Sequence, residues 1–240
     1  MTKVVLLAGG KGSRLNDVNP KPLVRLGEIP LVQHVMNSYN YFGYDEFILA
    51  TGHRHEDFEE YFNNINLPYG VRLINTGENA NTGERIQRLR FEIGAYPFCL
   101  SYSDGLSDVN LADVEQCFHT DKSSPDLLIT AVHPPERYGL MVLEECEGKT
   151  SPIKTFNEKP QRDDWINGGF MVCSPNIFDY IEKDDSFEGD CIPRIVLHQK
   201  MVGYKHLGNW GSIDTQKDLN AFMDLWNTGK AFWTNGGNNS

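Results

Sequence analysis

The sequence predicts an α/β fold, a three-layer sandwich with a mixed, mainly parallel sheet and a small antiparallel extension. Two observations carry this prediction. In the first half of the chain, short apolar strands alternate with segments of helical spacing, which is typical of a parallel sheet with helices on both faces. After about residue 134, strand-like segments follow one another without intervening helices, which indicates hairpins.

The expected elements of the first half follow from apolar runs and helical periodicity. Buried runs bounded by turn residues predict strands over Lys3–Leu7, Glu46–Ala50, Val71–Ile74, Pro97–Ser101 and Leu127–Val132. Helices are expected between them, over Leu31–Phe42, Glu56–Asn63, Gly83–Ile93 and Leu111–His119. In sheets of this kind ligands bind beyond the carboxyl ends of the strands, so the residues that directly follow these strands are the candidates for a site.

The second half begins with the expected antiparallel pieces and ends in helices. Strands are predicted over Gly139–Leu143, Ile153–Asn157, Gly168–Cys173 and Val202–Lys205, and helices over about Pro175–Ile181 and Gly189–Gln199. A final helix is expected from about Thr215 to Trp226, with Asp214 as its N-cap and Asp218 in its first turn. Because no linker is visible, we expect one domain over 1–234 and a disordered Gly/Asn-rich tail at 235–240.

Composition and charge exclude several classes of protein. The formal net charge is −11 over 240 residues and no basic run is visible, which argues against binding to nucleic acid or to an anionic membrane. No apolar run is long enough to cross a bilayer and no signal peptide is visible, so a cytoplasmic location is expected. The five cysteines are widely spaced without a C-x-x-C pair, which favours free thiols over disulfides or a zinc site.

A glycine-rich turn follows the first expected strand. It reads Leu7-Ala8-Gly9-Gly10-Lys11-Gly12-Ser13-Arg14. Glycines let backbone N–H groups approach phosphate oxygens, and Arg14 would add a forked cation. The residue three positions after Gly12 is Leu15, which argues against a dinucleotide-binding fingerprint, and the spacing of the turn does not fit a P-loop. A tight connection without a ligand is the alternative interpretation.

Lys21 stands between two prolines, Pro20 and Pro22. The prolines are expected to hold the backbone extended and so to aim the lysine side chain. A solvated lysine in a rigid turn is the alternative. The nearness of Arg14 in the sequence favours phosphate binding.

The run Leu-Ala-Gly-Gly-x-Gly-Ser-Arg-Leu followed by Lys-Pro-Leu resembles the signature of the sugar-phosphate nucleotidyltransferases. From about Thr2 to Phe232, the chain is most similar to the glucose-1-phosphate cytidylyltransferases within that superfamily. The resemblance implies a Rossmann-like sandwich whose antiparallel extension lies on the sugar side, with a nucleotide-binding part over about 1–110 and a sugar-phosphate-binding part over about 111–234. It also implies transfer of a nucleotidyl group from CTP to a sugar 1-phosphate, with Mg²⁺ as cofactor.

Two aspartates are candidate metal ligands. Asp104 directly follows an expected strand, in Ser103-Asp104-Gly105, where a carboxylate is well placed for a metal, although a plain Asp-Gly turn is the alternative. The resemblance implies that Asp104 binds Mg²⁺, and that Ser103 replaces the first glycine of the family motif. From the residues alone Asp214 is a helix cap, whereas the resemblance makes it the second metal ligand.

Thr82 and Gly83 stand at the start of an expected helix, where either N–H group could bind an anion or a base edge. An ordinary helix cap is the alternative. The resemblance implies the remaining site residues. The expected nucleotide-binding residues are Leu7, Ala8, Gly9, Gly10, Gly12, Ser13, Arg14, Lys21, Thr82, Arg85 and Ser103. The expected sugar-phosphate-binding residues are Tyr138, Gly139, Glu158, Lys159, Asn167 and Gly168. The expected catalytic set is Arg14, Lys21, Asp104, Lys159 and Asp214.

Several alternatives stay open. The same machinery suits a uridylyl- or thymidylyltransferase acting on another sugar or a non-sugar phosphate, and a non-catalytic nucleotide-sugar-binding module is a further possibility. The loops between Arg14 and Lys21 and between Tyr61 and Val71 are shorter than in the cytidylyltransferases, and Glu84 replaces a usual glycine. The expected partners are a nucleoside triphosphate and a sugar 1-phosphate. A homo-oligomer is compatible with the sequence, but the subunit number stays open.

Overall fold

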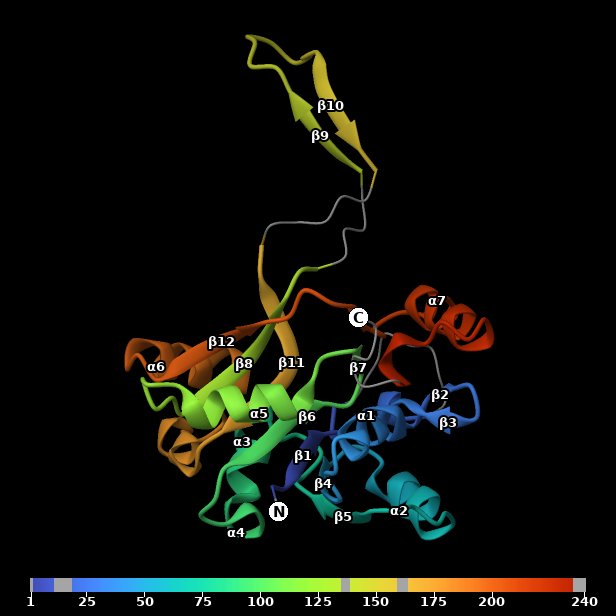
Figure 1. Cartoon of the computed structure of the whole chain (residues 1–240), viewed down its shortest axis with the longest axis vertical. Helices are drawn as coiled ribbons and strands as arrows, with labels where there is room; N and C mark the ends of the chain where they lie inside the picture. The colour runs from blue at the N-terminus through green and yellow to red at the C-terminus, as the bar shows by residue number, and fades with distance from the viewer. Residues whose placement is uncertain (1, 11–18, 135–138, 159–163, 235–240) are drawn as a thin grey trace.

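The computed structural model of the chain describes residues 2–10, 19–134, 139–158 and 164–234. Its centre is a seven-stranded sheet in the order β12-β8-β11-β6-β1-β4-β5 (Figure 1). The strands are β1 (Val4–Leu7), β4 (Glu46–Thr51), β5 (Gly70–Asn75), β6 (Phe98–Tyr102), β8 (Leu127–Val132), β11 (Ile166–Cys173) and β12 (Met201–Lys205). Strand β11 runs opposite to the other six, which confirms the mixed, mainly parallel sheet.

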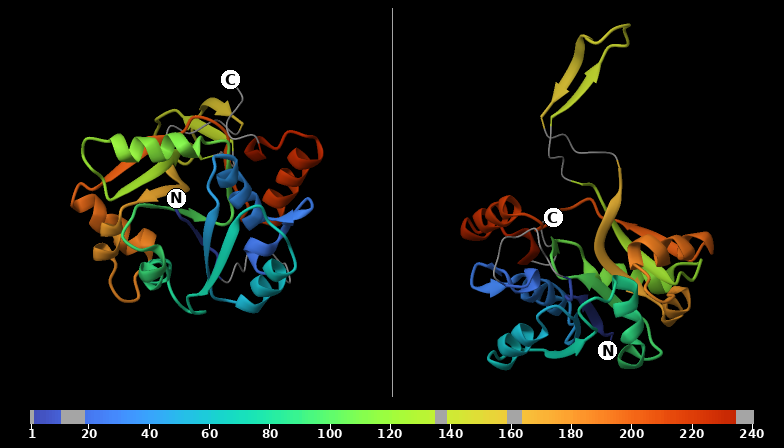
Figure 2. Two further views of the ribbon diagram at one scale, coloured as in Figure 1. Left: turned by 60° about the horizontal axis from the view of Figure 1, so that its bottom comes forward. Right: turned by 180° about the vertical axis from the view of Figure 1, so that it is seen from behind.

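Helices cover both faces of the sheet, as the sequence predicts (Figures 1 and 2). The residues of β1 show why, because Val4 and Leu6 belong to one apolar core and Val5 and Leu7 to the other. The first core is closed by α1 (Leu31–Tyr41), α2 (His55–Asn63), α5 (Leu111–Thr120) and α7 (Gln216–Asn227). The second is closed by α3 (Thr82–Arg88), α4 (Arg90–Ile93), η2 (Pro175–Tyr180), η3 (Phe187–Cys191) and α6 (Ile192–Leu197).

The helices over the second core depart from the predicted boundaries. The helix expected over Gly83–Ile93 is broken at Leu89, whose φ of −91° and ψ of 0° separate α3 from α4. Element η2 is a 3₁₀ helix, and η3 is a π-helical turn that leads into α6. Such π turns are frequent at functional sites, which directs attention to the residues of η3.

Several short elements were not predicted from the sequence. Strands β2 (Arg25–Leu26) and β3 (Ile29–Pro30) pair with each other, and β7 (Gly105–Ser107) pairs antiparallel with β13 (Trp210–Ser212). The turns η1 (Lys21–Leu23) and η4 (Phe232–Thr234) are single 3₁₀ turns. Two or three residues are too few to show a periodicity, so the pairing partners are visible only in the fold.

The antiparallel extension predicted after residue 134 is an arm (139–158) that stands away from the body of the molecule (Figures 1 and 2). It consists of β9 (Leu140–Leu143) and β10 (Ile153–Asn157), and every residue of both strands is exposed. The hydrogen bonds recorded between described residues of the arm, such as Glu144 N–H to the Pro152 carbonyl at 2.9 Å, join the arm to itself. The predicted tail at 235–240 lies outside the described residues.

All five cysteines are free, as predicted. Cys99, Cys173 and Cys191 are buried in the two apolar cores, where they pack as small apolar side chains. No helix in the described part of the chain has the length and apolar character needed to cross a membrane.

Candidate active site

The β7–β13 ladder brings two aspartates together that are far apart in the sequence. Asp104 immediately precedes β7 and Asp214 lies just after β13. Gly105 pairs with Ser212, and the N–H of Ile213 donates to the Asp104 carbonyl at 3.1 Å. The ladder therefore holds both aspartates beyond the carboxyl end of β6, the edge at which sheets of this kind bind ligands.

The prediction that Asp214 caps the final helix is wrong. Thr215 is the N-cap of α7, and it forms a capping box with Asp218. The N–H of Asp214 also donates to Asp218, at 3.2 Å. Because these two residues complete the helix start, the Asp214 carboxylate is left to accept hydrogen bonds from Ser212 at 2.8 Å and from Lys21.

The Lys21 ammonium lies between the two aspartates. Its Nζ is 2.6 Å from Asp104 Oδ2 and 2.8 Å from Asp214 Oδ1. The chain is not extended through Lys21 as predicted, because it enters η1 there and the Leu23 N–H bonds the Pro20 carbonyl at 2.8 Å. Burial lowers the pKa of Lys21, but the two carboxylates outweigh burial and raise that pKa overall, so the ammonium stays charged.

These two carboxylates fit a divalent metal. They already share one cationic group within hydrogen-bond distance of both, which shows that their oxygens converge on a single position. Mg²⁺ prefers such oxygens and commonly completes its shell with water and substrate phosphate oxygens. In the described part of the chain no three His, Cys, Asp or Glu side chains gather as a metal site. The fit is therefore to a metal held by Asp104, Asp214 and the substrate together.

We expect Lys21→Met to raise the affinity of the nucleotide-free protein for Mg²⁺. The ammonium competes with the metal for Asp104 and Asp214, and losing it should strengthen binding about tenfold, or about 1.4 kcal/mol. Isothermal titration with MgCl₂ measures the change. Lys3→Met is the control, because Lys3 bonds the Glu92 carbonyl at the opposite edge of the sheet. Unchanged or weaker Mg²⁺ binding in Lys21→Met would contradict the competition.

Arg85 holds the start of the glycine-rich turn by a hydrogen bond to Gly9. Its guanidinium is almost fully buried and donates to the Gly9 carbonyl at 2.9 Å, to the Gly77 carbonyl at 2.7 Å and to the Thr76 hydroxyl at 2.8 Å. A Cβ on Gly9 would lie 2.2 Å from Arg85 Nη1, so this close approach requires glycine. The resemblance implies that Arg85 lies beside the triphosphate. In the structure, the N–H groups of Arg85 bond to the protein and hold the turn in place.

A cavity of about 350 Å³ opens beside the glycine-rich turn. Five residues predicted to bind nucleotide line it, namely Leu7, Gly9, Gly10, Thr82 and Arg85. The other lining residues were missed by sequence reasoning, namely Ala80, Asn81, Tyr102, Ser186 and Glu188. The last two belong to the segment around η3, and no spacing in the sequence connects that segment to the turn.

Other groups predicted near the nucleotide bond to the protein itself. The Ala8 N–H donates to the Ala50 carbonyl at 3.0 Å, and the Ser103 hydroxyl donates to the Leu7 carbonyl at 2.9 Å. These bonds join the ends of β1, β4 and β6 into one platform. The prediction of a free Gly83 N–H for an anion or a base is wrong, because that N–H donates to the Asp185 carbonyl at 3.1 Å.

Two of the expected sugar-side residues lie on β11, next to the aspartates. Asn167 Oδ1 accepts from the Gly169 N–H at 2.7 Å, which fixes the turn at the start of the strand. The Gly168 carbonyl accepts from Trp210 Nε1 at 2.7 Å. Since Trp210 belongs to β13, this bond joins the turn at the start of β11 to the ladder that holds Asp104 and Asp214.

Two further expected sugar-side residues, Gly139 and Glu158, belong to the arm. Gly139 and Glu158 lie at its foot, where a Cβ on Gly139 would be 3.0 Å from Glu158 Oε2 and 2.5 Å from the Phe156 ring. The structure therefore places them together, but on an element separate from Asn167. The predicted residues that fall outside the described part of the chain are Gly12, Ser13, Arg14, Tyr138 and Lys159.

Asp185 and Arg194 join the η3 segment to the start of α3. The Arg194 guanidinium donates to the Asp185 carboxylate, which also accepts from the Glu182 N–H at 2.7 Å. The Asp185 carbonyl accepts from Gly83 and Glu84 at the start of α3. The hydrogen bond from Arg194 is the main cause that lowers the pKa of Asp185 to about 2.

We expect Asp185→Asn to reduce the free energy of unfolding at pH 7 by about 2 kcal/mol, the scale of a charge-assisted hydrogen bond. The pKa of Asp185 is lower in the folded chain than in the unfolded one, so this stabilisation is present above about pH 4 and is lost as the pH falls toward about 2. Urea unfolding across this range should show the variant and parent converging at low pH. A constant difference between them would contradict the ionic origin.

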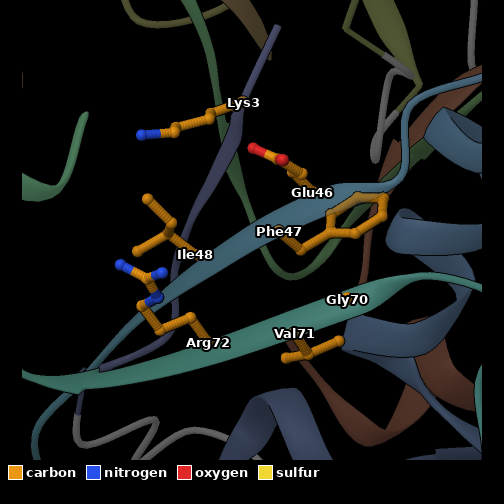
Figure 3. A pocket seen from close by; sticks show the side chains of 7 residues that line it. All are labelled: Lys3, Glu46, Phe47, Ile48, Gly70, Val71 and Arg72. Carbon is orange, nitrogen blue, oxygen red and sulfur yellow. The ribbon is translucent and has the colours of Figure 1, made fainter. Parts of the chain in front are cut away.

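A second cavity, of about 270 Å³, lies at the opposite edge of the sheet (Figure 3). It is formed at the amino ends of β4 and β5, with Lys3 and Arg72 at its rim. Both cations already bond to Glu92, by its carbonyl and its carboxylate respectively. This cavity lacks the glycine-rich turn that borders the first one. Because Asp104 and Asp214 also lie at the carboxyl end of β6, the candidate site is the edge that carries Asp104.

Comparison with known proteins agrees with this geometry. The profile of the nucleotidyl transferase family matches residues 3–228, which include both aspartates and the glycine-rich turn. The chain belongs to the nucleotidyl transferase family. This nucleotidyl transferase is 33% identical to the Bacillus subtilis protein named "Probable glucose-1-phosphate cytidylyltransferase", over 96% of this chain and 98% of that protein. It is 31% identical to the glucose-1-phosphate cytidylyltransferase of Salmonella typhimurium, with the same coverage.

Solved structures share the fold of this nucleotidyl transferase. HddC from Yersinia pseudotuberculosis complexed with GMP-PN superposes with a TM-score of 0.72 at 23% identity, covering 94% of this chain and all of that one. UDP-glucose pyrophosphorylase from Acinetobacter baumannii gives a TM-score of 0.72 at 16% identity, covering 98% and 96%. The sequence relatives and the fold together make the chain a sugar-phosphate nucleotidyltransferase.

Proposed function

We propose that this transferase converts CTP and a sugar 1-phosphate, in the first place α-D-glucose 1-phosphate, to a CDP-sugar and pyrophosphate. The observation that carries the proposal is the convergence of Asp104, Asp214 and Lys21 just after β6, the strand whose last residue, Tyr102, lines the cavity beside the glycine-rich turn. The cytidylyltransferases of Bacillus subtilis and Salmonella typhimurium support the choice of CTP and glucose 1-phosphate.

In the proposed reaction, a phosphate oxygen of the sugar 1-phosphate forms a bond to the α-phosphorus of CTP. The bond from that phosphorus to the oxygen bridging to the β-phosphate breaks in line, and pyrophosphate leaves. The protein has to position two anions and balance their charge. The backbone of Gly9 and Gly10 borders the triphosphate side, with Arg85 keeping the turn in place.

Asp104 and Asp214 would hold Mg²⁺, which neutralises charge on the phosphates when it is bound. Lys21, released from the two carboxylates, is then within reach of the phosphates and contributes a positive charge there. Arg14 is proposed as a further triphosphate contact and Lys159 as the contact to the sugar phosphate. Asn167 and Glu158 are proposed to bind sugar hydroxyls, and Gly139 to offer its backbone.

A pyrophosphate-release assay tests the proposal. The protein is mixed with Mg²⁺, each of CTP, UTP, dTTP and GTP in turn, and a panel of sugar 1-phosphates that includes glucose 1-phosphate. We expect release with CTP and glucose 1-phosphate to exceed the other pairs. Release confined to UTP or dTTP would replace the proposed donor, and release confined to another sugar would replace the proposed acceptor. If no pair releases pyrophosphate but the protein binds a nucleotide, the result would favour a non-catalytic module.

A further inference from the structure

The cavity of about 350 Å³ beside the glycine-rich turn is called the nucleotide cavity below. Glu188 is the one carboxylate among the described residues that line it. It belongs to η3, whose terminal residues Phe187 and Cys191 are fully buried in the second core. The Phe187 N–H also donates to the Thr82 hydroxyl at 2.8 Å, which joins η3 to α3. The backbone of Glu188 is therefore held firmly while its side chain stays exposed at the cavity.

Three hydroxyl groups fix the direction of the Glu188 carboxylate. Thr82 donates to Oε2 at 2.6 Å, Ser186 donates to the same oxygen at 3.2 Å, and Tyr102 donates to Oε1. Burial and the charge of Glu188 raise the pKa of Tyr102, so its hydroxyl stays protonated and remains a donor. A carboxylate offers about four acceptor positions. These three donors leave room for a hydrogen bond from a ligand.

An ionised carboxylate accepts hydrogen bonds and donates none, so it discriminates between base edges. Cytosine carries an exocyclic amine at the position where uracil and thymine carry a carbonyl oxygen. The cytosine amine would donate a hydrogen bond to a carboxylate. The uracil carbonyl would instead face the carboxylate as a second acceptor, and neither group would have a donor. CTP and UTP are otherwise nearly identical in shape, so this pair isolates the effect of one group.

We propose that Glu188 is a specificity-determining residue that accepts a hydrogen bond from the exocyclic amine of the nucleobase, so that the site takes cytosine in preference to uracil. This inference rests on the proposed function, since it requires that a nucleoside triphosphate occupies the cavity. Tyr102, Thr82 and Ser186 are positioning residues, because they hold the carboxylate in one direction without being needed as ligands of the base.

Calorimetric titration of CTP, UTP and GTP, each with Mg²⁺ and without sugar phosphate, tests the inference without turnover. We expect the parent protein to bind CTP at least about tenfold more tightly than UTP. Glu188→Gln should bring this ratio to about one or below, because the amide can donate to the uracil carbonyl. Tyr102→Phe removes one of the three hydroxyl donors and should give an intermediate ratio.

Glu182→Gln is the matched control. It makes the same chemical change in the same segment of the chain and removes the same charge. Glu182 pairs with Arg194 at 3.5 Å and does not line the cavity. Its CTP-to-UTP ratio should therefore equal that of the parent.

Equal binding of CTP and UTP by the parent, or an unchanged ratio in Glu188→Gln, would overturn this inference and leave the proposed function in place. Binding of no triphosphate would overturn both. Tighter binding of GTP than of CTP would overturn the choice of cytosine, since guanine also carries an exocyclic amine. Thermal melting of each variant shows whether a change in ratio accompanies normal folding.

Discussion

We expect Asp104→Asn to reduce pyrophosphate release by at least about 10³-fold, because it removes a negative charge from the proposed metal site of Asp104 and Asp214. A bound metal supplies several kcal/mol of charge stabilisation in the transition state, and about 4 kcal/mol corresponds to this factor. Folding should change by less than about 1 kcal/mol, since a partly exposed ion pair contributes little and Lys21 keeps Asp214 as its partner. Steady-state release assays and urea unfolding measure the two effects.

Asp108→Asn is the control for this experiment. Asp108 is close to Asp104 in sequence, but its carboxylate accepts from His206 Nε2 at 2.8 Å and from the Asn209 N–H at 2.8 Å. It therefore holds the turn before β13, and its loss should cost about 1–2 kcal/mol of stability with activity largely kept. Activity near the parent value in Asp104→Asn, or an equal loss in both variants, would contradict the metal role of Asp104.

Arg85→Ala has the largest expected effect on stability, about 3–5 kcal/mol, since several buried acceptors lose a charged donor at once. The carbonyls of Gly9 and Gly77 and the Thr76 hydroxyl all lose a charged partner. Because the Gly9 carbonyl is part of the glycine-rich turn, nucleotide binding should be lost together with stability. Urea unfolding and titration with CTP measure the two losses.

Arg90→Ala is the matched control for Arg85→Ala. Arg90 lies only five residues along the chain, about half exposed, and its carboxylate partner is Asp179 at 3.6 Å. Its replacement should change the free energy of unfolding by less than about 1 kcal/mol. If Arg85→Ala were as mild as Arg90→Ala, the guanidinium would not be what holds the turn.

The fold was largely predictable because its central strands are apolar runs bounded by turn residues. The run at Leu127–Val132 is reproduced to the residue, and the other central strands shift by only one or two residues. The helix over Gly83–Ile93 was predicted as continuous because apolar residues recur across it. The apolar residues on both sides of the break at Leu89 enter one core, so the periodicity gives no sign of the break.

The site was predictable only where its residues are neighbours in sequence. The glycine-rich turn and Asp104 each follow an apolar strand, which is a local signal. The meeting of Asp104 and Asp214 depends on a three-residue ladder, and the π-helical turn η3 brings Glu188 to the cavity beside the glycine-rich turn. Such contacts arise from tertiary packing, so neither the hydrophobic periodicity nor the secondary-structure propensity of the sequence predicts them. The cavity position of Tyr102 had one available signal in the sequence, because Tyr102 ends the strand β6 and precedes Ser103.

The arm has a consequence for how this enzyme can diversify. The cavity beside the glycine-rich turn is braced by buried groups, since Arg85 donates to the Gly9 carbonyl and Asp185 pairs with Arg194. Gly139 and Glu158 instead stand at the foot of an element whose strands are exposed throughout. We expect substitutions there to cost little folding free energy, so the arm can accumulate changes while the buried groups around the cavity are held fixed. On the proposed assignment of Gly139 and Glu158 to the sugar phosphate, acceptor choice is the part of the reaction that can change at the lower cost in stability.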